Sequence, residues 1–251
     1  MGHHGVARAI VTGANTGIGA STAALLARRK VDLWLTYAHD RVGADDVAAQ
    51  CRSEGVEAHV SQLDLRDPDA IAALLDCVAD VWGSVSILIN NAATCPYTSA
   101  DAITTDEWDD VLETNARGTF LMLRGALPLL RASDGDRAIV NVSSVAGQIG
   151  GITTSVHYAA SKAAVLAITR SYARLLAAEG IRVNAVTPGA ITTRITAQLD
   201  DDTRARLATV TPLGRLGTPD EVAATIVLLA SPESGYTTGA TYDVNGGIRM
   251  D

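Results

Sequence analysis

This chain contains very little lysine and no excess of positive charge. Of its 20 basic residues only Lys30 and Lys162 are lysines, and its 28 acidic residues give a formal net charge of -8. Such a surface repels a polyanion, so nucleic-acid binding is excluded as a function class. The rarity of lysine also draws attention to Lys162, because an arginine cannot lose its charge as a partly buried amine can.

Long apolar runs and paired cysteines are also absent from the sequence. No run approaches the roughly 20 apolar residues of a membrane span, and no hydrophobic signal core is present, so we predict a cytoplasmic protein without a membrane partner. Cys51, Cys77 and Cys95 lack metal-ligand spacing, which fits a reducing compartment and predicts no metal site. We exclude His3 and His4, since an expression remnant or a disordered terminus explains them more simply than a metal-binding pair does.

Short apolar runs alternate with helix-like stretches along the chain. The run 7–12 ends in glycines and precedes a segment, 20–29, in which Ala and Leu recur with helical spacing. The same pattern predicts further strands at 31–37, 57–61, 86–89, 137–142, 181–186 and 241–244. This alternation predicts a single α/β domain over residues 1–251, a doubly wound parallel sheet (Rossmann fold) with helices on both faces.

The least regular stretch of the chain is 188–219. It holds several prolines and glycines around one predicted short helix. Because a loop this long within a compact domain is usually functional, we predict a substrate lid at 188–219.

Tyr158 and Lys162 form the most informative pair of residues. Their four-residue spacing on a predicted helix puts a phenol and an ammonium group on one face. The pair is either catalytic or an ordinary packing contact along a helix. The segment Thr12–Gly19 carries a second signal, because its glycines follow the first strand and open the first helix, where a diphosphate can approach the backbone. Its spacing is GxxxGxG rather than GxGxxG, so a simple tight turn is the alternative interpretation.

Taken together, these features resemble the short-chain dehydrogenase/reductase family over essentially the full length of the chain. The family's motifs occur in order: the glycine loop, Asp64-Leu65, Asn90-Asn91-Ala92-Ala93, Asn115, Ser143-Ser144 and Pro188-Gly189-Ala190-Ile191-Thr192-Thr193. The resemblance implies an NAD(P)-dependent oxidoreductase that transfers hydride between a nicotinamide and a small ketone or secondary alcohol. Within this family, the chain is similar to 3-oxoacyl-carrier-protein reductases.

The resemblance implies a set of cofactor-binding residues. Asp64 would cap the adenine side, Asn91 to Ala93 would line the adenosine ribose, and Ile191 with Thr193 would contact the nicotinamide carboxamide. Each is also explicable as a turn or a strand end. Ala93 replaces the usual glycine of its motif and adds a methyl group near the cofactor. The full implied set is Gly13, Asn15, Thr16, Gly17, Ile18, Gly19, Thr36, Tyr37, His39, Asp64, Leu65, Asn91, Ala92, Ala93, Tyr158, Lys162, Pro188, Gly189, Ile191 and Thr193.

The catalytic roles implied by the resemblance fall on Asn115, Ser144, Tyr158 and Lys162. Tyr158 would be the general acid/base, and Lys162 with the nicotinamide's positive charge would lower its pKa from about 10. Ser144 would hydrogen-bond the carbonyl oxygen, and Asn115 would help to hold a water relay behind Lys162. We prefer Ser144 to Ser143 because it lies nearer the tyrosine in sequence. The fourteen residues from Ser144 to Tyr158 are one more than is commonest in the family, which predicts a local insertion at 147–157.

Cofactor choice depends on the end of the second strand, where a carboxylate would bond the ribose 2′-hydroxyl and exclude a 2′-phosphate. Thr36 occupies that position, so NADP is allowed and we favour it over NAD. Asp40 lies close by, however, and the basic residue that many NADP-dependent relatives place in the glycine loop is Thr16 here. His39 stands where such relatives have an arginine at the second strand, and Arg41 is a further candidate for the phosphate contact.

The predicted substrate is a small, free molecule. The loops that flank the site in relatives contain Thr94, Cys95, Pro96, Tyr97, Thr153, Thr154, Ser155 and His157, which are mostly small and mixed in polarity. For His157 we favour local contacts over an acid/base role. Acyl carrier protein is disfavoured, because Asp134, Asp136 and Glu179 stand where carrier-binding relatives have basic residues.

Three further expectations concern function and assembly. One alternative is an NAD-dependent dehydrogenase that oxidises a sugar or secondary alcohol, and a remote one is a non-catalytic, cofactor-sensing scaffold. A homotetramer is expected from the resemblance and from apolar residues at 165–176 and 108–123, although both stretches could simply pack on the core.

Overall fold

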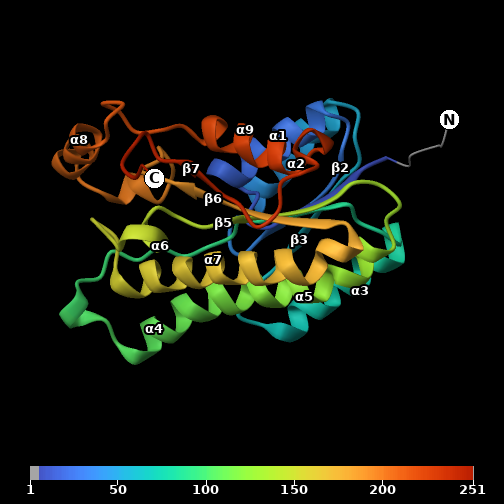
Figure 1. Ribbon diagram of the computed structural model, residues 1–251, viewed down its shortest axis with the longest axis horizontal. Helices are drawn as coiled ribbons and strands as arrows, with labels where there is room; N and C mark the ends of the chain where they lie inside the picture. The colour runs from blue at the N-terminus through green and yellow to red at the C-terminus, as the bar shows by residue number, and fades with distance from the viewer. Residues whose placement is uncertain (1–5, 251) are drawn as a thin grey trace.

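The fold is a parallel sheet covered by helices on both faces (Figure 1). The computed structural model describes residues 6–250, so His3 and His4 lie outside the described residues. The strands are β1 Arg8–Val11, β2 Asp32–Tyr37, β3 Ala58–Gln62, β4 Ile87–Asn90, β5 Arg137–Val142, β6 Ile181–Pro188 and β7 Thr241–Val244. They pair in the order β3-β2-β1-β4-β5-β6-β7, which confirms the predicted doubly wound sheet. All seven predicted strands are present, and β6 runs on to Pro188.

The helices form two layers. They are α1 Gly17–Arg28, α2 Arg41–Ser53, α3 Pro68–Trp82, α4 Thr105–Leu112, α5 Gly118–Arg131, α6 Ala146–Ile149, α7 Val156–Leu176, α8 Asp201–Val210 and α9 Pro219–Leu229. In Figure 1, α1, α2 and α9 lie on one face of the sheet, and α3, α5 and α7 lie on the other. No helix in the described part of the chain is long and apolar enough to cross a membrane.

Alternating side chains of the strands divide the core between these layers. In β1, Ala9 and Val11 belong to the cluster beneath α1, α2 and α9, whereas Ile10 belongs to the cluster beneath α3, α5 and α7. The same alternation recurs in β4, where Leu88 faces the second cluster. Strands that are buried on both faces consist of continuous apolar residues, which is why these strands could be predicted from the sequence.

Several helices begin at residues that the sequence marks clearly. Asp67 caps α3 by accepting hydrogen bonds from the next turn, and Pro68 takes the first helical position. Thr218 and Glu221 form a reciprocal capping box at the start of α9, also followed by a proline. The stretch 188–219 holds the predicted helix, α8, together with a short 3-10 turn at Thr196–Gln198.

A chain of buried polar groups joins the central strands to α7. Asn90 Nδ2 donates to Asn141 Oδ1 at 2.8 Å, and Asn141 Nδ2 donates to Thr169 Oγ1 at 2.9 Å. Asn141 and Thr169 are fully buried. Because buried amide groups need such partners, these two hydrogen bonds fix α7 relative to the ends of β4 and β5.

We therefore expect Asn141→Ala to lower the free energy of unfolding by about 2–4 kcal/mol, because it leaves Asn90 Nδ2 buried without an acceptor and removes the hydrogen bond that the Thr169 hydroxyl accepts, although that hydroxyl still donates to Val165 O. Urea denaturation measures this change. Ser53→Ala, which removes an exposed hydroxyl that bonds Gln50 O, is the control and should change the unfolding free energy by less than about 0.5 kcal/mol. Equal changes of the unfolding free energy in the two variants would show that the buried hydrogen bonds of Asn141 contribute no more to stability than an exposed one does.

Candidate active site

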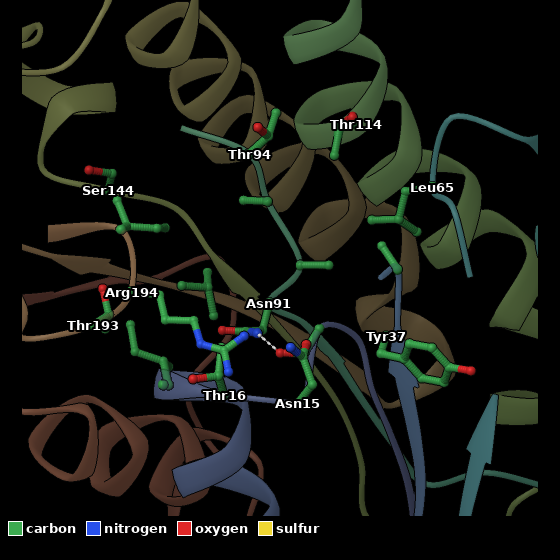
Figure 2. A pocket seen from close by; sticks show the side chains of 18 of the residues that line it. Asn15, Thr16, Tyr37, Leu65, Asn91, Thr94, Thr114, Ser144, Thr193 and Arg194 are labelled. Carbon is green, nitrogen blue, oxygen red and sulfur yellow. Dashed lines mark hydrogen bonds between the residues drawn. The ribbon is translucent and has the colours of Figure 1, made fainter. Parts of the chain in front are cut away.

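A cavity of about 610 Å³ lies at the carboxyl ends of the strands, where the strand order reverses between β1 and β4. Ligands of open parallel sheets bind at this position. The cavity collects almost all of the predicted site residues: Gly13, Asn15, Thr16, Gly17, Ile18, Thr36, Tyr37, His39, Asp64, Leu65, Asn91, Ala92, Ala93, Ser144, Tyr158, Lys162, Pro188, Gly189, Ile191 and Thr193. Figure 2 labels seven of them, Asn15, Thr16, Tyr37, Leu65, Asn91, Ser144 and Thr193. Gly19 and Asn115 are buried outside this lining.

The glycine loop suits a bound diphosphate. Gly13 and Gly17 have φ angles of +64° and +55°, which favour glycine. Thr16 precedes α1 without a side-chain cap, and the first turn of α1 contains no acidic residue. The backbone N–H groups at the start of α1 therefore favour the binding of an anion. The positive-φ glycines and the uncapped start of α1 are features that could hold the diphosphate of a dinucleotide.

The loop is fixed by the segment that follows β4. Asn91 Nδ2 donates to the carbonyl oxygens of Thr12 and Gly13, both at 2.9 Å. In return, the Thr12 hydroxyl accepts the amides of Asn91 and Ala92, both at 3.0 Å. A Cβ on Gly13 would approach Ala92 Cα to 2.8 Å, so a larger residue would push the two loops apart. The Asn91 side chain thus shapes the cavity wall as well as lining it.

At the other end of the cavity a charged group holds the Asp64 side chain. Arg66 Nη2 donates to Asp64 Oδ2 at 2.7 Å, and Arg66 Nη1 donates to Asp110 at 2.9 Å. The hydrogen bonds from Arg66 lower the pKa of the Asp64 carboxyl. Asp64 is therefore ionised and oriented at the rim of the cavity.

Three of the predicted catalytic side chains meet at the deep end of the cavity. Tyr158 and Lys162 lie on the buried side of α7, and the Lys162 ammonium is 5.7 Å from the centre of the Tyr158 ring. Lys162 Nζ donates to Val142 O at 2.8 Å, just before Ser143 and Ser144. Ser143 Oγ donates to Lys162 O at 2.7 Å, so its proton is committed to holding α7. Ser144 hydrogen-bonds Tyr158, which leaves Ser144 as the serine placed beside the phenol.

Asn115 lies in a π-helical turn, Glu113–Arg117, between α4 and α5. Such turns widen a helix and are frequent at functional sites. The Asn115 side chain exchanges hydrogen bonds with the backbone of Thr94, at 2.9 Å each, and donates to Ser161 Oγ at 3.0 Å. The side chain thus holds the loop after β4 against α7, and a link from Asn115 to Lys162 would need a bridging water.

Burial changes the acidities of the pair. It lowers the pKa of the Lys162 amine to about 8. It also raises the pKa of the Tyr158 phenol above its usual range, with a further contribution from the Cys95 thiol. Burial thus raises the Tyr158 pKa in the protein without cofactor, whereas the lowered pKa expected from sequence, which includes the charge of a bound nicotinamide, stays a prediction.

A small apolar cluster covers Tyr158. Cys95 and Ala146 pack on the phenol together with Tyr97 and Ile195. Tyr97 Oη donates to Ile195 O at 3.3 Å, which joins the loop after β4 to the stretch after β6. The space next to the phenol is therefore enclosed by small and medium-sized side chains.

Comparison with known proteins agrees with this geometry. The sequence profile of a family described as Enoyl-(acyl carrier protein) reductase matches residues 13–249. A 3-oxoacyl-(acyl-carrier-protein) reductase of Staphylococcus aureus is 38% identical over 243 residues, which cover 96% of this chain and 98% of the relative. The chain belongs to the short-chain dehydrogenase/reductase family. It is accordingly an oxidoreductase that acts on a CH–OH or C=O group with NAD or NADP.

Two further members of the short-chain dehydrogenase/reductase family differ in their named activities. A cis-4-hydroxycyclohexanecarboxylate dehydrogenase of Sinomonas cyclohexanicum is 42% identical over 240 residues, covering 95% of each chain. A 3-oxoacyl-(acyl-carrier-protein) reductase of Vibrio harveyi is 38% identical over 252 residues, covering 96% of this chain and 97% of the relative. Membership in the family thus fixes the reaction type and leaves the substrate open.

Some residues of this short-chain dehydrogenase/reductase site were not identified from sequence. Arg66, Asp110 and Arg194 line the cavity, and each forms an ion pair within it. The only available signals were the closeness of Arg66 to Asp64 and of Arg194 to Thr193. His157 is fully buried, bonds Glu107 at 3.1 Å and stacks on Trp108, as expected of a histidine with a packing role.

The rarity of lysine makes the acidity of Lys162 directly measurable. In protein labelled with ¹³C-lysine, we expect one of the two Cε signals to titrate with a midpoint near pH 8, because burial disfavours the ammonium form. NMR titration measures the midpoint, and Lys162→Met identifies the signal by its loss. A midpoint near the ordinary lysine value of about 10.4 would contradict the proposed burial of this amine.

Proposed function

We propose that the protein is an NADPH-dependent ketoreductase that reduces a compact, free ketone to a secondary alcohol. The observation that carries this proposal is the buried arrangement of Ser144, Tyr158 and Lys162 at the deep end of the dinucleotide-sized cavity. The fold alone would not support it, because one fold serves many functions. An intact acid/base pair within such a cavity also argues against a non-catalytic scaffold.

The roles of the side chains follow from their chemistry. Bound NADPH supplies the hydride. The Ser144 hydroxyl donates a hydrogen bond to the carbonyl oxygen, and Tyr158 gives its phenolic proton to that oxygen as negative charge develops. The raised pKa of Tyr158 means that the phenol carries a proton at neutral pH, ready for donation. The Lys162 ammonium, 5.7 Å from the centre of the Tyr158 ring, then stabilises the phenolate and, through Asn115 and water, returns a proton to it.

Other residues would hold the cofactor. The glycine loop and the start of α1 would bind the diphosphate, Asp64 and Leu65 the adenine, and Ile191 with Thr193 the carboxamide. Thr36 and Tyr37 end β2 without a carboxylate, which supports NADP. We extend the proposal to the stretch 188–219 as a substrate lid, since Ile195 covers Tyr158 and bonds Tyr97. The single domain, the homotetramer and the cytoplasmic location stay predictions.

A second candidate function is the oxidation of an alicyclic or other secondary alcohol with NAD. The relative with 42% identity is named as a dehydrogenase of a hydroxycyclohexane carboxylate, which favours this direction. The same catalytic groups serve it, with Tyr158 accepting the proton. In that direction the raised pKa of the phenol makes activity increase with pH, because the phenolate is the required form.

The surface charges bear on whether a carrier protein presents the substrate. Glu179 pairs with Arg131 at 2.6 Å and Asp136 pairs with Arg182 at 2.7 Å, so two of the three predicted repulsive charges are compensated. Asp134 is exposed nearby. The region is thus nearly neutral, not basic. A neutral surface gives an acidic carrier no electrostatic steering, which supports a free substrate.

Replacing the acid/base residue tests the proposed function directly. We expect Tyr158→Phe to reduce kcat for ketone reduction by about 100-fold to 10,000-fold, because the alkoxide loses its proton donor, while NADPH affinity changes little. Turnover by stopped-flow and binding by fluorescence titration give the two values. Tyr236→Phe, at a fully exposed position, is the matched control. Full turnover of Tyr158→Phe would refute the mechanism.

The carrier question has its own experiment. We expect the same 3-oxoacyl group to show similar KM values when linked to pantetheine and to acyl carrier protein, because the docking region is neutral. Glu179→Gln should lower the KM of the carrier-linked substrate alone, since it releases Arg131 from its ion pair. Steady-state kinetics at low and high salt measure both effects. The free-substrate proposal would be wrong if the wild type had a KM at least about tenfold lower for the carrier-linked substrate than for the pantetheine-linked one, and if this difference disappeared at high salt.

A further inference from the structure

An ion pair spans the cavity at its glycine-loop end. Arg194 Nη1 donates to Asp40 Oδ2 at 2.6 Å, across 154 positions of sequence. Both residues line the cavity, Asp40 between β2 and α2 and Arg194 in the stretch after β6. In Figure 2 the Arg194 side chain extends toward Thr16 and Asn15 of the glycine loop. The pair therefore closes over the region that a dinucleotide's phosphates would enter.

Asp40 is held in a fixed position. Its carboxylate caps α2 by accepting Gly43 N at 2.9 Å, and it also bonds the Asn15 side chain. The Gly43 and Arg194 contacts lower its pKa, so the group is ionised. Asp40 follows the end of β2, where an acidic group favours a ribose 2′-hydroxyl and opposes a 2′-phosphate. An unpaired Asp40 would therefore select NAD.

Arg194, by contrast, can change its partner. Its side chain is 66% exposed, and exposed ion pairs contribute little stability. The other strong cations that line the described cavity are committed elsewhere: Arg66 holds Asp64 and Asp110, and Lys162 is buried against Val142 O. Arg194 is thus the cation at this end that a phosphate can attract without breaking a buried contact.

We propose that Arg194 and Asp40 together set the cofactor preference, with Arg194 binding the 2′-phosphate of NADP and Asp40 competing with that phosphate for the guanidinium. The position in the glycine loop that could carry a basic side chain is Thr16, so the positive charge comes instead from the stretch after β6. A guanidinium fits a phosphate with two parallel hydrogen bonds. The inference rests on the proposed function only in assuming that a dinucleotide occupies this cavity.

The test measures binding rather than turnover. Fluorescence titrations with NADPH and NADH give Kd values for the wild type, Arg194→Gln and Asp40→Asn. We expect Arg194→Gln to raise the Kd of NADPH about tenfold or more and that of NADH less than about threefold. Asp40→Asn, which keeps a helix cap, should shift the NADPH to NADH preference in the opposite direction. Arg215→Gln, an arginine of the same stretch that pairs with Glu221, is the control.

Two fragments of the dinucleotide distinguish a contact of Arg194 with the 2′-phosphate from a contact with the diphosphate. Adenosine 2′,5′-bisphosphate probes the 2′-phosphate and ADP probes the diphosphate, both by calorimetry and both independent of catalysis. Loss of bisphosphate affinity alone in Arg194→Gln supports the proposal. Equal losses for both fragments, or no loss, overturn it, and thermal unfolding checks that each variant is folded. If the wild type prefers NADH but Arg194→Gln still removes the residual NADPH binding, the proposed cofactor fails and this inference stands.

Discussion

The contact between the loops after β1 and β4 determines where the rest of the cleft lies. The Thr12 hydroxyl and the Asn91 amide exchange hydrogen bonds with the opposite backbone, at the place where strand order reverses. Because Gly13 has no side chain, the two loops can approach closely enough to form these bonds. The start of α1, the bottom of the cavity and the loop that carries Thr94 and Cys95 all take their positions from this contact.

A second layer of polar contacts connects this frame to the chemistry. Asn115 binds the backbone of Thr94, and Ser143 binds the backbone of Lys162, so Asn115 is tied to the loop after β4 and the serine pair is tied to α7. These groups are buried, and a buried polar group is stable only with its partner in place. The result is a rigid arrangement in which Ser144 and Tyr158 need little adjustment to reach a carbonyl oxygen.

The sequence predicted the local parts of this protein better than the parts that depend on packing. Short-range sequence patterns predicted the strands, the glycine loop and the pair of Tyr158 and Lys162, because spacing along a helix or strand fixes which side chains share a face. The ion pair of Arg194 with Asp40 joins segments with no such relation. The acidity of Tyr158 without cofactor could not be predicted for the same reason, because its burial depends on how Cys95 and its neighbours cover it.

One short turn after β6 contacts both the proposed cofactor side and the proposed substrate side of the cavity. Thr196 Oγ1 donates to Ile191 O at 2.7 Å and accepts Thr193 N at 3.0 Å, which makes residues 191–196 a single stiff unit. Arg194 on this turn reaches the cofactor side, and Ile195 covers Tyr158 on the substrate side. A stiff turn cannot move one end alone, so entry of the dinucleotide and access to the phenol are mechanically linked.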